Sequence, residues 1–117
     1  YLTEEGVFKT LRYVASLAAG SEIVFQYFTS EALCNDEDRP IVTLWKARMS
    51  AQGEPAEPVL SLFEPTILAT HMREIGFTPV WDVGPGEADA RYCAGRTDGL
   101  RLYPHMHLMK ARVGSIA

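Results

Sequence analysis

Cysteine is scarce in this chain, which has only Cys34 and Cys93 among its 117 residues. The two cysteines do not have the spacing of a disulfide or metal-binding pair, so we expect free thiols in a reducing cytoplasm. Long hydrophobic runs are also lacking, because no apolar stretch reaches the length of about 18 residues that a transmembrane helix needs. These two absences argue against a disulfide-stapled protein and a membrane-spanning one. We therefore expect a cytoplasmic protein without a membrane partner.

Positive charge is in short supply, with 11 Lys and Arg against 15 Asp and Glu and a net charge of -4. Binding to phosphate backbones requires an excess of Lys and Arg, so no nucleic-acid partner is expected. A glycine-rich nucleotide loop is missing too. The only glycine cluster, Gly84-Pro85-Gly86, lacks the third glycine of such a loop. It is also predicted to lack the strand-turn-helix context that a nucleotide loop needs.

The stretch that is present and most informative is Gly20–Phe28. Hydrophobic residues make up 47% of the chain, which is typical of a globular domain. In this stretch Ile23, Val24 and Phe25 follow one another without alternation. That pattern predicts a strand buried on both faces, inside a parallel sheet with helices on each side. The fold class that follows is α/β.

A helix is predicted directly before this strand. Thr3 can cap its N-terminus, Val7 and Leu11 belong to its apolar stripe, and Gly20 is expected to end it. A helix that leads by a short turn into a buried strand is the second half of a βαβ unit. The first strand of that unit is therefore expected before residue 1. Since the chain also begins with Tyr1 rather than Met, we expect a processed or truncated chain.

The remaining segments predict two further strands and an insertion. Residues 30–62 are expected to form a helical insertion or lid, and a helix is predicted over about Glu64–Ile75. The strand Phe77–Val83 contains Pro79, which cannot donate to a ladder and so indicates a sheet edge. A short helix over Glu87–Ala94 and then a loop are expected. The last strand, Met106–Val113, alternates apolar and polar residues, which favours antiparallel pairing.

This order of elements resembles the C-terminal half of a class I S-adenosylmethionine-dependent methyltransferase. More narrowly, it is similar to the leucine carboxyl methyltransferase-like family and its bacterial O-methyltransferase relatives. The similarity covers the whole chain except the insertion, and it departs from the family in lacking the N-terminal half with its cofactor loop. The segments that carry it are Tyr1-Leu2-Thr3-Glu4-Glu5, Gly20-Ser21-Glu22-Ile23-Val24-Phe25, Phe63-Glu64-Pro65 with Gly76-Phe77, Ala90-Arg91-Tyr92-Cys93-Ala94-Gly95-Arg96, and Leu108-Met109-Lys110-Ala111-Arg112-Val113.

The resemblance implies a fold and a partial domain. Residues 1–117 would form the C-terminal half of a Rossmann-like methyltransferase sheet, with strands five, six and seven, flanking helices and the insertion at 30–62. The seventh strand would be antiparallel and would lie between the fifth and the sixth. The cofactor of the full-length parent would be S-adenosyl-L-methionine, and no cofactor is expected to bind this chain tightly.

Candidate site residues follow from the resemblance and from the rule that ligands bind beyond the carboxyl ends of parallel strands. Tyr1 is similar to a family tyrosine that faces the substrate carboxylate, so the resemblance implies a positioning role in catalysis. Tyr27 and Thr29 end the buried strand and are candidate substrate-binding residues, with core packing as the alternative for Tyr27. Arg91 and Tyr92 are the other substrate-binding candidates, and ion pairing with the acidic segment 35–38, Asp89 or Asp98 is the favoured alternative for Arg91.

Three histidines offer weaker candidates. His105 and His107 are two residues apart and could in principle hold a metal, but no third ligand has suitable spacing, so an ordinary strand end is favoured. His71 is expected to be a hydrogen-bonded or half-exposed residue of a helix. We therefore predict no metal site.

Two functions are compatible with these observations. The first is the C-terminal portion of a methyltransferase that acts on a carboxylate or hydroxyl of a small or peptidic substrate and is inactive alone. The second is a non-catalytic interaction module. A buried strand without its neighbours would expose an apolar edge that pairs with another chain, so we expect a homodimer or association with a missing half.

Overall fold

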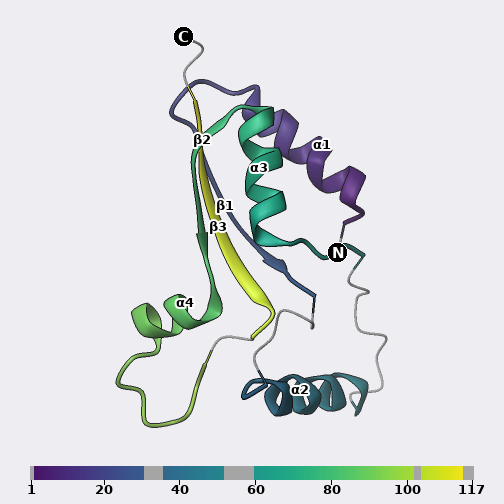
Figure 1. Cartoon of the computed structure of the whole chain (residues 1–117), viewed down its shortest axis with the longest axis vertical. Helices are drawn as coiled ribbons and strands as arrows, with labels where there is room; N and C mark the ends of the chain where they lie inside the picture. The colour runs from purple at the N-terminus through teal and green to yellow at the C-terminus, as the bar shows by residue number, and fades with distance from the viewer. Residues whose placement is uncertain (1, 31–35, 52–59, 102–103, 115–117) are drawn as a thin grey trace.

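The structure, a computed structural model, describes residues 2–30, 36–51, 60–101 and 104–114. Two helices in succession separate the first strand from the second, and one further helix precedes the third strand (Figure 1). In chain order they are α1 (Glu4–Ala15), β1 (Glu22–Phe28), α2 (Arg39–Ala51), α3 (Pro65–Ile75), β2 (Phe77–Val83), α4 (Pro85–Tyr92) and β3 (Met106–Val113). The α/β class that the sequence predicts is therefore confirmed.

The three strands form one sheet in the order β1-β3-β2. β3 pairs antiparallel with both neighbours, so β1 and β2 run parallel to each other at the two edges. This order and these directions are those that the resemblance implies for its last three strands. The edge position that Pro79 predicts for β2 is confirmed, and the pairing of β2 with β3 shifts register between Phe77 and Val80, where Pro79 lies.

The core lies on one face of the sheet, beneath α1 and α3 (Figure 1). Both helices present an apolar stripe to this face, and burial of such stripes is what stabilises short helices in a protein. The alternation predicted for β3 is confirmed, because every second residue of the strand from Met109 onward points into the core. The buried core residues are Leu11, Tyr27, Leu68, Ala69, Met72, Phe77, Met109, Ala111 and Val113.

The opposite face of the sheet is open, and here the sequence prediction is wrong. β1 was expected to be covered on both faces, but its exposure alternates and Val24 is 67% exposed. Trp81 of β2 lies on the same open face with 40% exposure, and Lys110 of β3 sits over its ring at 5.2 Å. Both described helices that cover the sheet lie on its other side, so within the described residues β1 has only one covered face.

The helix ends follow local capping chemistry. Thr3 caps α1 by accepting a hydrogen bond from the Gly6 amide at 3.1 Å, as predicted. The expected end of this helix at Gly20 is wrong. α1 ends at Ala15, and the hydroxyl and amide of the next residue, Ser16, donate hydrogen bonds back to its last turn. Gly20 instead has a φ of 91° in the turn before β1. Gly76 does end α3, with a φ of 130° that favours glycine.

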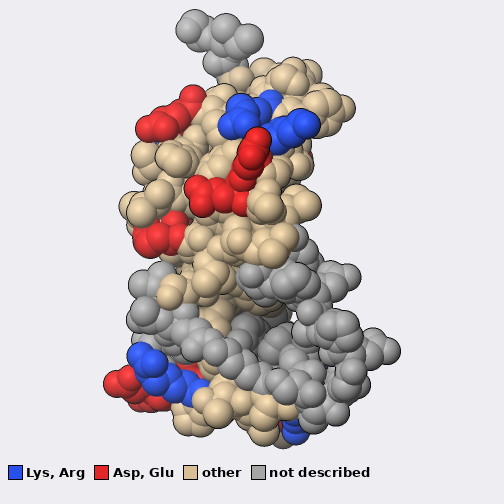
Figure 2. All heavy atoms as spheres, turned by 90° about the vertical axis from the view of Figure 1, so that its right-hand side faces the viewer, with Lys and Arg blue, Asp and Glu red and all other residues tan. Residues whose placement is uncertain are grey.

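The segment predicted as an insertion contains α2 within its described part. In Figure 1 α2 lies beyond one end of the sheet, away from the layer formed by α1 and α3. Figure 2 shows the face that carries α1, where acidic and basic side chains lie next to each other. Within the described residues this face therefore carries charges of both signs.

Candidate functional site

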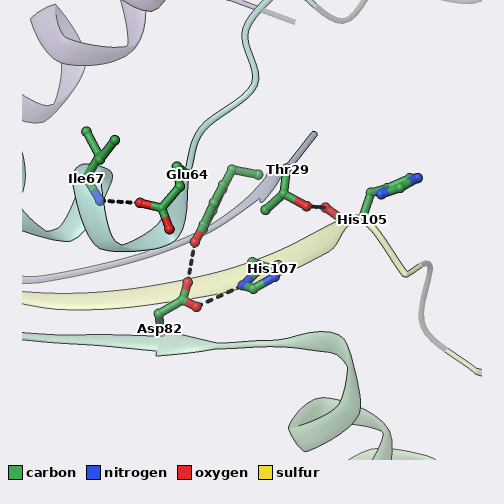
Figure 3. Close-up of polar contacts among 7 residues, drawn as sticks. Thr29, Glu64, Ile67, Asp82, His105 and His107 are labelled. Atoms are coloured by element: carbon green, nitrogen blue, oxygen red, sulfur yellow. Dashed lines mark hydrogen bonds and ion pairs between the residues drawn. The ribbon is translucent and has the colours of Figure 1, made fainter. Parts of the chain in front are cut away.

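A polar network joins the three strands on the covered face of the sheet, near the ends of β1 and β2. The Tyr27 hydroxyl donates a hydrogen bond to Oδ1 of Asp82, and Nδ1 of His107 lies 2.8 Å from Oδ2 of the same carboxylate (Figure 3). Both oxygens of Asp82 are therefore engaged. Each of the three side chains comes from a different strand, with Tyr27 on β1, Asp82 on β2 and His107 on β3.

Sheet register explains why these residues meet. Tyr27 is the direct partner of His107 in the β1–β3 ladder, so their side chains share a face, and their rings lie 5.5 Å apart. Asp82 is the partner of Met109, two residues further along β3, and lies on the same face. Diagonal neighbours of this kind are within reach of long side chains. The network is thus a consequence of the central position of β3.

The network is partly withdrawn from water. Tyr27 is 6% exposed, and the side chains of His107 and Asp82 are 18% and 24% exposed. Burial raises the pKa of the Tyr27 phenol well above its ordinary value, and the hydrogen bond to the Asp82 carboxylate raises this pKa further. Tyr27 therefore stays neutral and acts as a hydrogen-bond donor at physiological pH.

A second pair of buried groups closes the end of the β1–β3 ladder. The amide and the hydroxyl of Thr29 both donate to the carbonyl oxygen of His105, at 2.8 and 3.3 Å. Both residues are 3% exposed. Close by, Glu64 caps α3 by accepting from the Ile67 amide at 2.8 Å (Figure 3). These bonds fix the chain where β1 ends and β3 begins, at the same end of the sheet as the polar network.

Some of the site residues predicted from sequence lie at this end of the sheet, and others lie elsewhere. Tyr1 lies outside the described residues. Tyr27 and Thr29 lie together at the end of β1, with their hydroxyls bonded inside the fold. Arg91 and Tyr92 lie on α4, which follows β2. Arg91 pairs with Glu87 at 2.7 Å, so the favoured ion pairing is observed, but with Glu87 and not with the acidic residues that were expected.

α4 presents its two candidate residues to solvent. Tyr92 is 67% exposed. Arg96, which follows the helix, pairs with Asp98, and this contact holds the pKa of the Asp98 carboxyl below its usual range. Exposed ion pairs of this kind contribute little to stability. In the described residues no contact joins Arg91 or Tyr92 to Tyr27.

Two members of the network, Asp82 and His107, were missed as site residues by sequence reasoning. His107 was weighed as a metal ligand beside His105, with an ordinary strand end favoured, and the described residues contain no group of three or more side chains that could hold a metal ion. A signal was available for Asp82, which is the charged residue of the strand Phe77–Val83 and lies next to its last position. Its partners, however, depend on sheet register, which the sequence does not display.

The glycine cluster does not fit a nucleotide. Contrary to the sequence prediction, Gly84 lies at a strand–helix turn, because α4 begins at Pro85 rather than at Glu87. The glycine makes room for a side chain of this chain, since a Cβ on Gly84 would lie 3.4 Å from Cε1 of His107. Pro85, at the first helical position, also offers no amide hydrogen to a phosphate. The Gly84-Pro85-Gly86 turn therefore lacks the features of a phosphate-binding loop.

A groove runs along the outer edge of β1. It has a volume of about 290 Å³ and is lined mainly by apolar residues of α1 and β1, among them Val7, Leu11, Phe25 and Tyr27. Alternate residues of β1 direct their main-chain groups toward β3, as the bond from the Val113 amide to the Ser21 carbonyl shows at 2.7 Å. The residues between them direct their main-chain N–H and C=O groups away from β3, toward the groove, where the structure describes no pairing strand.

Comparisons with known proteins find no matching family model, no matching curated protein and no matching solved structure. None of the helices in the described part of the chain combines the length and apolar character of a membrane span. Functional interpretation therefore depends on the geometry described above.

Proposed function

We propose that this chain is the C-terminal portion of an S-adenosylmethionine-dependent O-methyltransferase of the leucine carboxyl methyltransferase-like kind. The observation that carries the proposal is the sheet order β1-β3-β2, with an antiparallel third strand between two parallel ones. This is the arrangement that the resemblance requires of strands five, seven and six.

The helices support the same proposal. α1 leads into β1 and α3 leads into β2, and both helices lie on one face of the sheet (Figure 1). The second halves of two successive βαβ units have this form. The cofactor would be held by residues that do not belong to this chain, so the chain alone is proposed to be inactive. The parent enzyme would be cytoplasmic and would methylate a carboxylate or a hydroxyl of a small or peptidic molecule.

The test concerns the coding sequence that precedes the codon for Tyr1. The proposal requires it to encode a strand, a glycine-rich turn and a helix, followed by an acidic residue for the ribose. A protein extended by that sequence should bind S-adenosylhomocysteine in a calorimetric titration, whereas the 117-residue chain should not. If the upstream sequence encodes no such turn, or if the extended protein binds no cofactor, the proposal is wrong.

A second candidate function, as an association module, is favoured by the outer edge of β1. Glu22, Val24 and Gln26 direct their main-chain groups away from β3, and a strand edge of this kind pairs with strands of other chains. The apolar groove beside this edge offers a surface for the side chains of such a strand. The chain would then form a homodimer or bind the other half of the fold.

Proline at the edge tests this second function. Gln26→Pro removes an outward amide without removing a bond to β3, because residue 26 faces away from that strand. We expect the wild-type chain to sediment as a dimer at high micromolar concentration, Gln26→Pro as a monomer, and the control Gln26→Ala as a dimer. A monomeric wild-type chain at that concentration rules out self-association through this edge.

A further inference from the structure

The network at the ends of β1 and β2 holds one histidine in a defined orientation. Oδ2 of Asp82 lies 2.8 Å from Nδ1 of His107, and Oδ1 accepts the Tyr27 hydroxyl. A carboxylate only accepts hydrogen bonds, so Nδ1 of His107 must carry a hydrogen. In the neutral imidazole the other nitrogen, Nε2, then carries a lone pair and can accept a proton.

The surroundings of His107 leave its ring approachable. The side chain is 18% exposed, and Gly84 lies beside it. Since a Cβ on Gly84 would lie 3.4 Å from Cε1 and 3.9 Å from Nε2, a larger residue there would cover this edge of the ring. The register pairs Phe28 with Met106 and Val83 with Leu108, which places His107 where β1 and β2 both end. Ligands bind at this end of the strands in α/β sheets.

We propose that His107 is the proton acceptor for a hydroxyl-bearing substrate bound at this end of the sheet, with Asp82 and Tyr27 as positioning residues. The proposal rests on the proposed function and narrows its acceptor class. In the proton step the substrate O–H bond breaks, the N–H bond forms at Nε2, and the electron pair stays on the oxygen. The imidazolium then releases its proton to water. A carboxylate substrate has no proton to give, so a histidine held in this way indicates a hydroxyl acceptor.

The first test measures the tautomer of His107 in the unmodified chain. Nitrogen-15 NMR at about pH 8.5, where an ordinary histidine is neutral, separates the two tautomers. The hydrogen bond to Asp82 requires the Nδ1–H form at His107. His71, which lies exposed on α3, provides the comparison and should show mainly the other form. If His107 also shows mainly the Nε2–H form, Nε2 cannot accept a proton and the proposal is wrong.

The second test measures methyl transfer by the protein extended with its upstream coding sequence. Phenols and the matching benzoates serve as acceptors, with variants His107→Gln and His71→Gln. We expect wild type and His71→Gln to methylate phenols, and His107→Gln to lose about 100-fold or more in kcat with a smaller change in KM. Methylation of benzoates alone, or of phenols equally in all three proteins, overturns the assignment of His107 but leaves the proposed function standing. Failure of the wild type both to transfer methyl groups and to bind S-adenosylhomocysteine overturns both.

Discussion

Removal of the Tyr27 hydroxyl is the most direct test of the network that joins the three strands. Tyr27→Phe keeps the ring, which contacts Phe63 with a centroid distance of 6.3 Å, and deletes only the hydrogen bond to Asp82. A hydrogen bond to a charged group contributes about 1.5–3 kcal/mol. Asp82 keeps its contact with His107 and is 24% exposed, so water can replace part of what is lost. We expect a cost near the lower end, about 1.5 kcal/mol.

Urea denaturation followed by circular dichroism measures this cost. With a slope of about 1–3 kcal/mol per molar urea, a loss of 1.5 kcal/mol lowers the midpoint by roughly 0.5–1.5 M. Tyr13→Phe is the matched control, because Tyr13 is 67% exposed and its substitution should change stability by less than about 0.5 kcal/mol.

The raised pKa of Tyr27 adds a dependence on pH. A raised pKa in the folded state means that the folded protein retains a proton that the unfolded chain releases above about pH 10. The contribution of this group is therefore complete below that pH and falls as the pH rises further. Absorbance at 295 nm, compared with that of Tyr27→Phe, should show that Tyr27 in the folded protein ionises only above the pH at which the unfolded chain releases this proton. If Tyr27 ionises at the same pH in the folded and unfolded protein, or if Tyr27→Phe is no more costly than Tyr13→Phe, the reasoning is refuted.

Three further predictions concern the core, an ion pair and a turn. Met72→Ala should cost about 2–5 kcal/mol in urea denaturation, because Met72 is a fully buried residue of α3, and a smaller loss would indicate that the core refills the space. Glu22→Gln should slightly lower the free energy of unfolding at pH values above the ordinary pKa of glutamate, because Arg112 lowers the pKa of Glu22 in the folded protein. The difference from wild type should vanish as the pH falls through the pKa of Glu22 in the folded protein. A difference that persists in acid would contradict this. Gly76→Ala should cost about 1–2 kcal/mol because of the positive φ, whereas Gly86→Ala, with open space and no positive φ, should raise or leave unchanged the thermal midpoint.

Much of the fold could be predicted because its signals are local. The strands Phe77–Val83 and Met106–Val113 have the expected bounds, and Pro79 correctly indicates an edge strand. The first strand was predicted less well. Its unbroken apolar run indicated two covered faces, yet Val24 is 67% exposed. An apolar run shows that both faces of a strand could be buried, but it does not show whether a helix lies over each of them.

The candidate site could be predicted only in part. Tyr27 lies at the end of the first strand as expected, and of its two predicted environments, pocket wall or core packing with a bonded hydroxyl, the structure shows a buried ring whose hydroxyl is bonded to Asp82. Asp82 and His107 are 25 residues apart, and their contact follows from the pairing of β2 with β3. Gly84 was expected in a break after the strand, whereas it leads directly into α4 and leaves room for the His107 ring. Contacts between strands require a register, and register is a property of the assembled sheet.

The central strand, β3, follows both of its neighbours in the sequence, and this order has a consequence for assembly. Glu22 at one end of the β1–β3 ladder pairs with Arg112, 90 residues later. Both ladders of the described sheet need β3, so neither can form before the ribosome has made Met106–Val113. Helices α1 and α3 can form early from local contacts, but these two ladders must close late and over long loops, which slows folding. Until then the strand edges that β3 later covers remain open to pairing with other chains, which favours aggregation of the nascent chain.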